Sequence, residues 1–246
     1  GVVLAKDGQS LPHGEVFAPE WENSLDMIDA KKFMSKGFRG PQLTVLSPGQ
    51  YRYNTRLFDI TLHSALTVKV GEVVVIKANA GKTYTEETET VNGVPLVPTS
   101  FRGIWKEPLI PNTYYIHPVA YEAIHIKTTN RIYSYTSSAE NVNKKEENDH
   151  SILVRTKDGF EFPVDIRVSA KVSAEDAPYL VAKLGDADSD KNNDGFDILE
   201  EIVILPSVRA IFRNTAENHS AIEYIGTRSN IEKIATELFK KELDTY

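Results

Sequence analysis

The hydrophobic pattern is clearest between Phe160 and Val172, where apolar and polar residues alternate. The apolar positions are Phe162, Val164, Ile166, Val168 and Ala170. Successive side chains of a strand point to opposite faces, so the alternation predicts a strand with one buried and one solvated face. The turn signal Asp158-Gly159 comes just before it. Together with the apolar run Ile152–Thr156, this signal predicts a β-hairpin.

Short runs rich in β-branched and aromatic residues predict further strands in the N-terminal half and up to Thr136. These runs are Leu43–Val45, Arg52–His63, Ala65–Val70, Glu72–Lys77, Ala123–Thr128 and Arg131–Thr136. Pro48-Gly49 is a turn pair because proline presets φ and glycine tolerates positive φ. Asn92-Gly93 is a two-residue hairpin signal inside a polar stretch.

From Ser173 onward the apolar spacing becomes helical. Three pairs with capping-box spacing predict helix starts: Ser173/Asp176, Ser220/Glu223 and Ser229/Glu232. The run Ile198–Arg213 reads as a helix that is broken or kinked near Pro206. The last helix carries Ile231, Ile234, Ala235, Leu238 and Leu243 on one side. It has no stop signal at Tyr246, and we expect it to continue into a coiled coil outside this chain.

One phrase occurs twice, as FRGPQLTVLSPGQY from Phe38 and as FRGIWKEPLIPNTY from Phe101, 63 positions later. At this offset Phe38, Arg39, Gly40, Leu46, Pro48 and Tyr51 fall on Phe101, Arg102, Gly103, Leu109, Pro111 and Tyr114. So many matches at one offset indicate a duplication. The first half of the chain is therefore expected to contain two copies of one β-rich module.

Composition narrows the class of protein. The chain has 246 residues, 41% hydrophobic and 26% charged, which is ordinary for a soluble globular protein. A net charge of −7 argues against nucleic acid as a partner, because phosphate binding needs clustered Lys and Arg. The absence of cysteine excludes disulfides, thiolate metal sites and cysteine nucleophiles. The chain opens on Gly1 and not on Met, and we expect it to be trimmed from a longer one.

Four motifs follow one another in the second half: the stretch FRGIWKEPLIPNTYYIHPVAYEAIHIKT, the hairpin TKDGFEFPVDIRVSAKV, the helix from Pro206 to Arg213, and Arg228 at the opening of the last helix. In this order they resemble the SPFH or band 7 domain of stomatins, prohibitins, flotillins and the bacterial HflK and HflC proteins. The resemblance covers roughly Val68 to Tyr246. The leading module resembles the extra β-domain of long bacterial members.

The resemblance implies an α+β fold with a mixed or antiparallel sheet, flanking helices and the start of a C-terminal coiled-coil helix. We expect a β-rich module over residues 1–67, an SPFH domain over 68–226 and the coiled-coil start over 227–246. It also implies a function without a reaction. Such proteins are membrane-associated scaffolds that assemble with copies of themselves, are held by an anchor outside this chain, and organise membrane patches or membrane proteases. The subfamily and the side of the membrane stay open.

The segment DKNNDGFDILEE suggests calcium as a cofactor. It fits the calcium-loop pattern D-x-[DN]-x-[DN]-G-x5-E, with ligands Asp190, Asn192, Asp194 and Glu201. Gly195 permits the sharp turn, and the carbonyl of Phe196 would be a further ligand. Against this, Asp197 stands where such loops have an apolar residue. The alternative is a solvated acidic loop between two helices, so a calcium-regulated binding module remains a second hypothesis.

Signals for catalysis are weak in this sequence. The six histidines are scattered without metal-site spacing, and we expect them at the surface or at strand edges. No nucleophile elbow, phosphate loop or dinucleotide fingerprint is present. We therefore assign no catalytic residue, and an unrecognised hydrolase is the third and weakest hypothesis.

Overall fold

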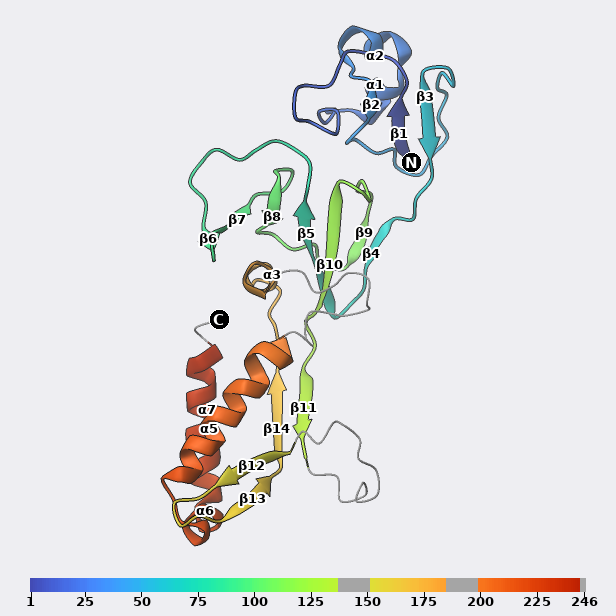
Figure 1. The fold of residues 1–246 in the computed structure, drawn as a ribbon. Coiled ribbons are helices and arrows are strands. Elements are labelled where there is room, and N and C mark those ends of the chain that lie inside the picture. Colours follow the sequence, from blue (N-terminus) through green and yellow to red (C-terminus); the bar gives the residue numbers. More distant parts are fainter. Residues whose placement is uncertain (137–150, 185–198, 244–246) are drawn as a thin grey trace. The chain divides into compact units, whose positions relative to one another are not determined.

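The computed structural model describes residues 1–136, 151–184 and 199–243, and the chain divides into two compact units. The first unit is Gly1–Thr128 together with Ser173–Asp194, and the second is Thr129–Val172 together with Gly195–Tyr246. Small sheets and helices occur in both units (Figure 1), which confirms the predicted α+β class. The boundaries predicted at residues 67 and 226 remain predictions.

The first unit begins with a three-stranded sheet, which we call module A (residues 1–62). Its strands are β1 (Val2–Ala5), β2 (Gly40–Pro41) and β3 (Phe58–Thr61), in the antiparallel order β2-β1-β3. The strand predicted at Leu43–Val45 is wrong, because the chain leaves the sheet after Pro41 and Leu43 is buried in a core instead. The core of module A contains Phe33 and Phe58, whose rings meet edge to face at 4.8 Å.

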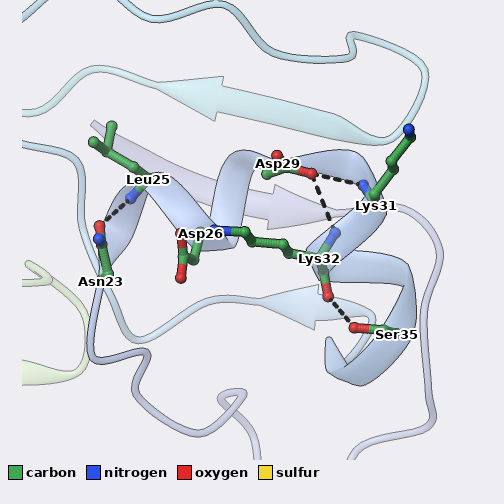
Figure 2. Close-up of polar contacts among 7 residues, drawn as sticks. All are labelled: Asn23, Leu25, Asp26, Asp29, Lys31, Lys32 and Ser35. Carbon is green, nitrogen blue, oxygen red and sulfur yellow. Dashed lines mark hydrogen bonds and ion pairs between the residues drawn. The ribbon is translucent and has the colours of Figure 1, made fainter.

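Two short helices, α1 (Ser24–Ile28) and α2 (Ala30–Lys36), lie between β1 and β2 and were not predicted. Figure 2 shows their caps. Asn23 accepts a hydrogen bond from the Leu25 N–H at 2.9 Å, and Asp29 accepts from the N–H groups of Lys31 and Lys32 at 2.9 and 3.1 Å. The Lys32 N–H is the largest cause that lowers the pKa of the Asp29 carboxyl. Asp29 ends α1 and starts α2, so one side chain fixes the turn between them.

A second sheet in the first unit forms module B (residues 72–128). Its strands are β5 (Glu72–Ala78), β6 (Thr90–Val91), β7 (Val94–Val97), β8 (Gly103–Trp105) and β10 (Tyr121–Lys127), in the order β10-β5-β8-β7-β6. β7 and β8 are parallel and the other pairs antiparallel, so the sheet is mixed. The predicted Asn92-Gly93 hairpin is confirmed between β6 and β7, with both residues at positive φ.

Three further elements belong to the described part of the first unit. β4 (Leu66–Val68) pairs antiparallel with β9 (Asn112–Tyr114), and α3 (Ala177–Leu184) packs against β5, β6, β7 and β8. The predicted pair Ser173/Asp176 is hydrogen-bonded, but α3 begins only at Ala177, so Ser173 does not occupy the cap position of the helix. The Ser173 hydroxyl donates to the Asp176 carboxylate, and the Asp176 N–H donates back to Ser173 Oγ at 3.2 Å.

Modules A and B are two copies of one structure. β1 matches β5, β2 matches β8, and β3 matches β10, with the same partners in register. The matching pairs are Leu4–Pro41 with Lys77–Ile104, Ala5–Gly40 with Ala78–Gly103, and Ala5–Phe58 with Ala78–Tyr121. The offset is 73 residues at β1 and 63 residues from Phe38 onward. The duplication is therefore confirmed, and the insert between the matching strands is ten residues shorter in module B.

Side-chain hydrogen bonds repeat along with the strands. The hydroxyls of Tyr51 and Tyr114 donate to the carbonyl four residues earlier, at 2.8 and 2.9 Å. Gln42 and Trp105 occupy matching positions, and each donates a side-chain N–H to the carbonyl of the phenylalanine four residues earlier, at 2.7 and 3.0 Å. Two unlike side chains thus satisfy the same main-chain acceptor.

Gly8 and Gly81 occupy matching positions in the two modules, where the chain passes close to the repeated Phe-Arg-Gly phrase. Gly8 has a φ of +134° and Gly81 a φ of +114°. A Cβ on Gly8 would stand 2.9 Å from the Gly37 carbonyl oxygen, and a Cβ on Gly81 2.9 Å from that of Ser100. Each glycine lets one segment approach the residues just before and within the Phe-Arg-Gly phrase, and no other residue type fits there without strain.

The second unit contains two short antiparallel pairs. β11 (Arg131–Tyr135) pairs with β14 (Ile166–Ala170), and β12 (Ile152–Arg155) pairs with β13 (Glu161–Val164). The single strand predicted over Phe160–Val172 is wrong at Asp165, where the chain changes from one partner strand to another. The alternation itself is correct, because Ile166 is buried and its alternate neighbours are half-buried. The predicted hairpin at Gly159 is confirmed, with a φ of +85°.

Four helical segments follow in the second unit: η2 (Glu200–Ile204), α5 (Leu205–Glu217), α6 (Ala221–Gly226) and α7 (Arg228–Leu243). Figure 1 shows α5 and α7 side by side, and the two helices are in contact. The break predicted near Pro206 takes the form of a π-helical turn, in which the Leu205 N–H reaches the Glu200 carbonyl. Proline has no N–H and crowds the preceding turn, and the wider π turn relieves both problems.

The helix starts agree with the sequence at one site and disagree at another. Ser220 and Glu223 form the predicted capping box at the start of α6. The cap predicted at Ser229 is wrong, because α7 already begins at Arg228. The carbonyl of Thr227, the last residue of the preceding turn, accepts from the N–H groups of Asn230 and Ile231 at 2.8 and 3.1 Å. Helix α7 therefore starts directly out of α6, without a serine cap.

Candidate functional sites

The calcium hypothesis falls mostly on residues that the structure does not describe. Asp190, Asn192 and Asp194 lie outside the described residues, and Glu201 is exposed in η2. Among the residues that are described, no group of three or more His, Asp or Glu side chains is placed to hold a metal ion. Calcium binding by this loop stays a prediction.

His117 is the clearest residue whose role the sequence reasoning misjudged. It is 3% exposed and not at the surface. Its Nδ1 accepts hydrogen bonds from the N–H groups of Val119 and Ala120 at 3.2 and 3.1 Å. The matching residue in module A is Asn54, whose Oδ1 accepts from the Arg56 N–H at 2.9 Å. Both side chains fix the turn that leads into the last strand of their module, so the repeat was the signal that could have revealed this role.

The surroundings of His117 favour its neutral form. Burial is the larger cause that lowers the pKa of this imidazole, and the charge of His63 is the smaller one. Phe17 packs edge-on against the ring with centroids 4.9 Å apart. Within the described residues Nε2 is buried without a hydrogen-bond partner. Protonation would place an uncompensated charge between module A and module B.

Residues of module A cover module B on one side. Leu43 is buried in the core cluster of module B, together with Val68 and Trp105, and Phe17 packs against the same cluster. The Glu15 carboxylate contacts the Arg102 guanidinium at 2.9 Å, and both side chains are about 40% exposed. Arg102 is the arginine of the second Phe-Arg-Gly phrase, so the repeated motif contributes directly to the contact between its two copies.

The arginine of the first phrase, Arg39, lies in a different setting. It lines an open groove of about 500 Å³ with Ala5, Lys6, Ser10, Leu11 and Gly40. The Lys6 ammonium is already paired with Asp59 at 2.7 Å. Ser10 is the only hydroxyl in this lining, and no carboxylate or histidine in it could act as a general base.

In the second unit, Asp158 ties the β12–β13 hairpin to a helix. Its carboxylate accepts from the Ala221 N–H at the start of α6 at 3.1 Å, and from the Thr156 hydroxyl. The Thr156 hydrogen bond is the largest cause that lowers the pKa of Asp158. The Lys157 N–H also donates to the His219 carbonyl at 2.9 Å. The Asp-Gly motif of this hairpin thus positions α6.

A buried tyrosine lies beside the π turn. Tyr135 on β11 is 1% exposed, and its hydroxyl donates to the Glu200 carboxylate at 3.2 Å. Burial first, and then the charge of Glu200, raise the pKa of this phenol. The phenol therefore stays protonated at physiological pH and serves as a hydrogen-bond donor that fixes the π turn.

Comparison with known proteins identifies the class. The model of the SPFH domain / Band 7 family matches residues 66–246, which include module B and the whole second unit. The chain belongs to the SPFH/Band 7 family, and module A precedes the matched region as an additional β-rich segment. A search of curated proteins found no match to the chain.

Membership of this family indicates a general kind of function. Members are typically membrane-associated scaffolds, generally lack enzymatic activity and commonly form oligomers. Within the ranges that the structure describes, every helix falls short of the length and apolar content that a bilayer span requires.

Proposed function

We propose that this chain is the β-rich and helical part of a membrane-associated oligomeric scaffold that acts by assembly and catalyses no reaction. The observation that carries the proposal is the Band 7 match over residues 66–246. The copies would associate with one another, and a segment outside this chain would hold them at the membrane. Membrane patches or a membrane protease would be organised by the assembly.

Helix α7 supports assembly through a second helix. Its buried residues Ile231 and Ala235 face the second unit, yet Ile234 and Leu238 are 37% and 44% exposed. These two side chains are four residues apart and so lie on one side of the helix. An apolar pair of this kind on a polar-rich helix suits helix–helix association, as in a coiled coil.

Sedimentation velocity across a concentration series tests this assembly. We expect oligomers that grow with concentration, and a shift toward monomer in Leu238→Lys. The matched control is Thr236→Lys, which adds the same charge at an exposed polar position of the same helix. A monomer at every concentration, or equal effects of both substitutions, contradicts the proposal.

Membrane association is tested on the protein as its gene encodes it. We expect the protein in the membrane fraction of lysed cells, and we expect it to stay there after a high-salt wash. Recovery in the supernatant before any wash would contradict the proposal. A salt-released protein would point to electrostatic attachment in place of an anchor.

A further inference from the structure

Arg39 and Arg102 occupy the same place in the two modules but differ in the partners of their guanidinium groups. Arg102 receives the Glu15 carboxylate, which comes from the insert of module A. Arg39 is exposed, and within the described residues its guanidinium has no hydrogen bond or ion pair. Because Asp59 already neutralises Lys6, Arg39 is the unbalanced charge of the groove.

Module B has an acidic insert where module A has the insert that bears Glu15. In module B this insert follows Gly81 and contains Glu86, Glu87 and Glu89. Glu89 is engaged, since its carboxylate contacts Lys106 at 3.0 Å and accepts from the Tyr179 hydroxyl at 2.8 Å. Glu86 accepts one hydrogen bond from Tyr84, and Glu87 has no partner among the described residues.

The two inserts therefore start at the same place in their modules and carry the same charge. Only the insert of module A contacts the arginine of a Phe-Arg-Gly phrase. We infer that the Glu86–Glu87 loop of one copy of this chain binds in the Arg39 groove of a second copy. The contact repeats between chains the one that Glu15 and Arg102 make within a chain. This inference rests on the proposed oligomeric function and names a surface that the assembly uses.

The contact is heterologous, because a loop on one copy meets a groove on the next. Each bound copy leaves its own loop or groove available, so the assembly is a closed ring or an open filament and not an isologous dimer. An exposed ion pair is weak by itself. Its role is to fix the direction and register of copies that are also joined elsewhere, and the contact should weaken in high salt.

Cysteine crosslinking tests the contact on a clean background, because the chain has no cysteine. Ser10→Cys, in the groove, is mixed with Glu87→Cys on a copy that bears a size tag. We expect a disulfide-linked heterodimer under mild oxidation. The matched control is Arg52→Cys mixed with Glu87→Cys, because Arg52 is also exposed in module A but does not line the groove.

Charge reversal tests the pairing itself. Arg39→Glu, added to the copy that carries Ser10→Cys, should lower the yield of the heterodimer several-fold. Glu86→Lys, added to the copy that carries Glu87→Cys, should restore it. Arg39→Gln is the milder variant if the reversal disturbs folding. Equal crosslinking in the Arg52 control, or a yield that Arg39→Glu leaves unchanged, overturns the inference. If either of these results is obtained with a protein that still forms oligomers, the inference fails but the proposed scaffold function stands, because the copies are also joined elsewhere. A protein that is monomeric throughout overturns both.

Discussion

The substitution Gly81→Ala probes the close approach that both modules share. Gly81 has a φ of +114°, and an added Cβ would stand 2.9 Å from the Ser100 carbonyl oxygen. That oxygen cannot retreat freely, because two residues later the Arg102 N–H is bonded to the Lys82 carbonyl at 2.9 Å. The new methyl group must therefore displace main chain and not the end of a flexible side chain.

Two costs add in this variant. A residue with a Cβ at such a φ costs about 1–3 kcal/mol. The displacement of main chain adds about 1 kcal/mol or more, in the range of overpacking costs. We expect a loss of about 2–4 kcal/mol in the free energy of unfolding of the first unit. For a chain of this size the loss lowers the melting temperature by roughly 5–15 °C.

Differential scanning calorimetry is the suitable assay, because two compact units need not unfold in one transition. The matched control is Gly93→Ala, since Gly93 has a φ of +80° but no atom within 4 Å of its added Cβ. The control should lose only the conformational cost of about 1 kcal/mol. Equal losses in both variants would refute the argument that the close approach, and not φ alone, requires glycine at residue 81.

Three other predictions concern pH and metal. Because burial lowers the pKa of His117, only the unfolded chain takes up this proton as the pH falls below about 6.5, so thermal stability should fall between pH 7 and 5. His117→Asn, which copies Asn54, should flatten this pH dependence, and an unchanged slope would contradict it. Asp158→Ala should lower the melting temperature of the second unit, and the contribution of Asp158 in the wild type should be present above its usual pKa of 3.8 and be lost as the pH falls through the lowered value. If the Ala221 cap is dispensable, the variant will melt like the wild type. Calcium at 100 times its dissociation constant should stabilise the fold by ~2.7 kcal/mol, and Glu201→Gln should reduce that gain. Identical melting in millimolar calcium and in chelator would end the calcium hypothesis.

Strands and hairpins were readable from the sequence where a local signal determines them. The Asn92-Gly93 turn allows only a tight hairpin, and the alternation around Ile166 has only one buried side. The partner exchange at Asp165 was not readable, because alternation is the same whether a strand has one partner or two. Helices α1 and α2 were missed for another reason: five and seven residues are too few for a helical period to show.

For the candidate sites, too, the sequence revealed some features and the structure was needed for others. The Arg39 and Arg102 positions were visible in the sequence as a repeat, because identical residues at a fixed offset need no structure to be found. Their different surroundings were not visible, since the Glu15 contact joins residues 87 positions apart. His117 was misjudged because a histidine that accepts from two main-chain N–H groups has no sequence signature of its own.

The unequal inserts of the two modules have a practical consequence. Between Gly8 and Phe38 the fold accommodates a long insert with two helices, and between Gly81 and Phe101 a shorter one with a hairpin. The flanking strands keep the same register in both cases. Loop closure becomes only slowly less favourable as a loop lengthens. The tip of the β6–β7 hairpin at Asn92-Gly93 is therefore a position where an epitope or a fluorescent domain can be introduced to follow this protein in cells without disturbing the sheet that holds it.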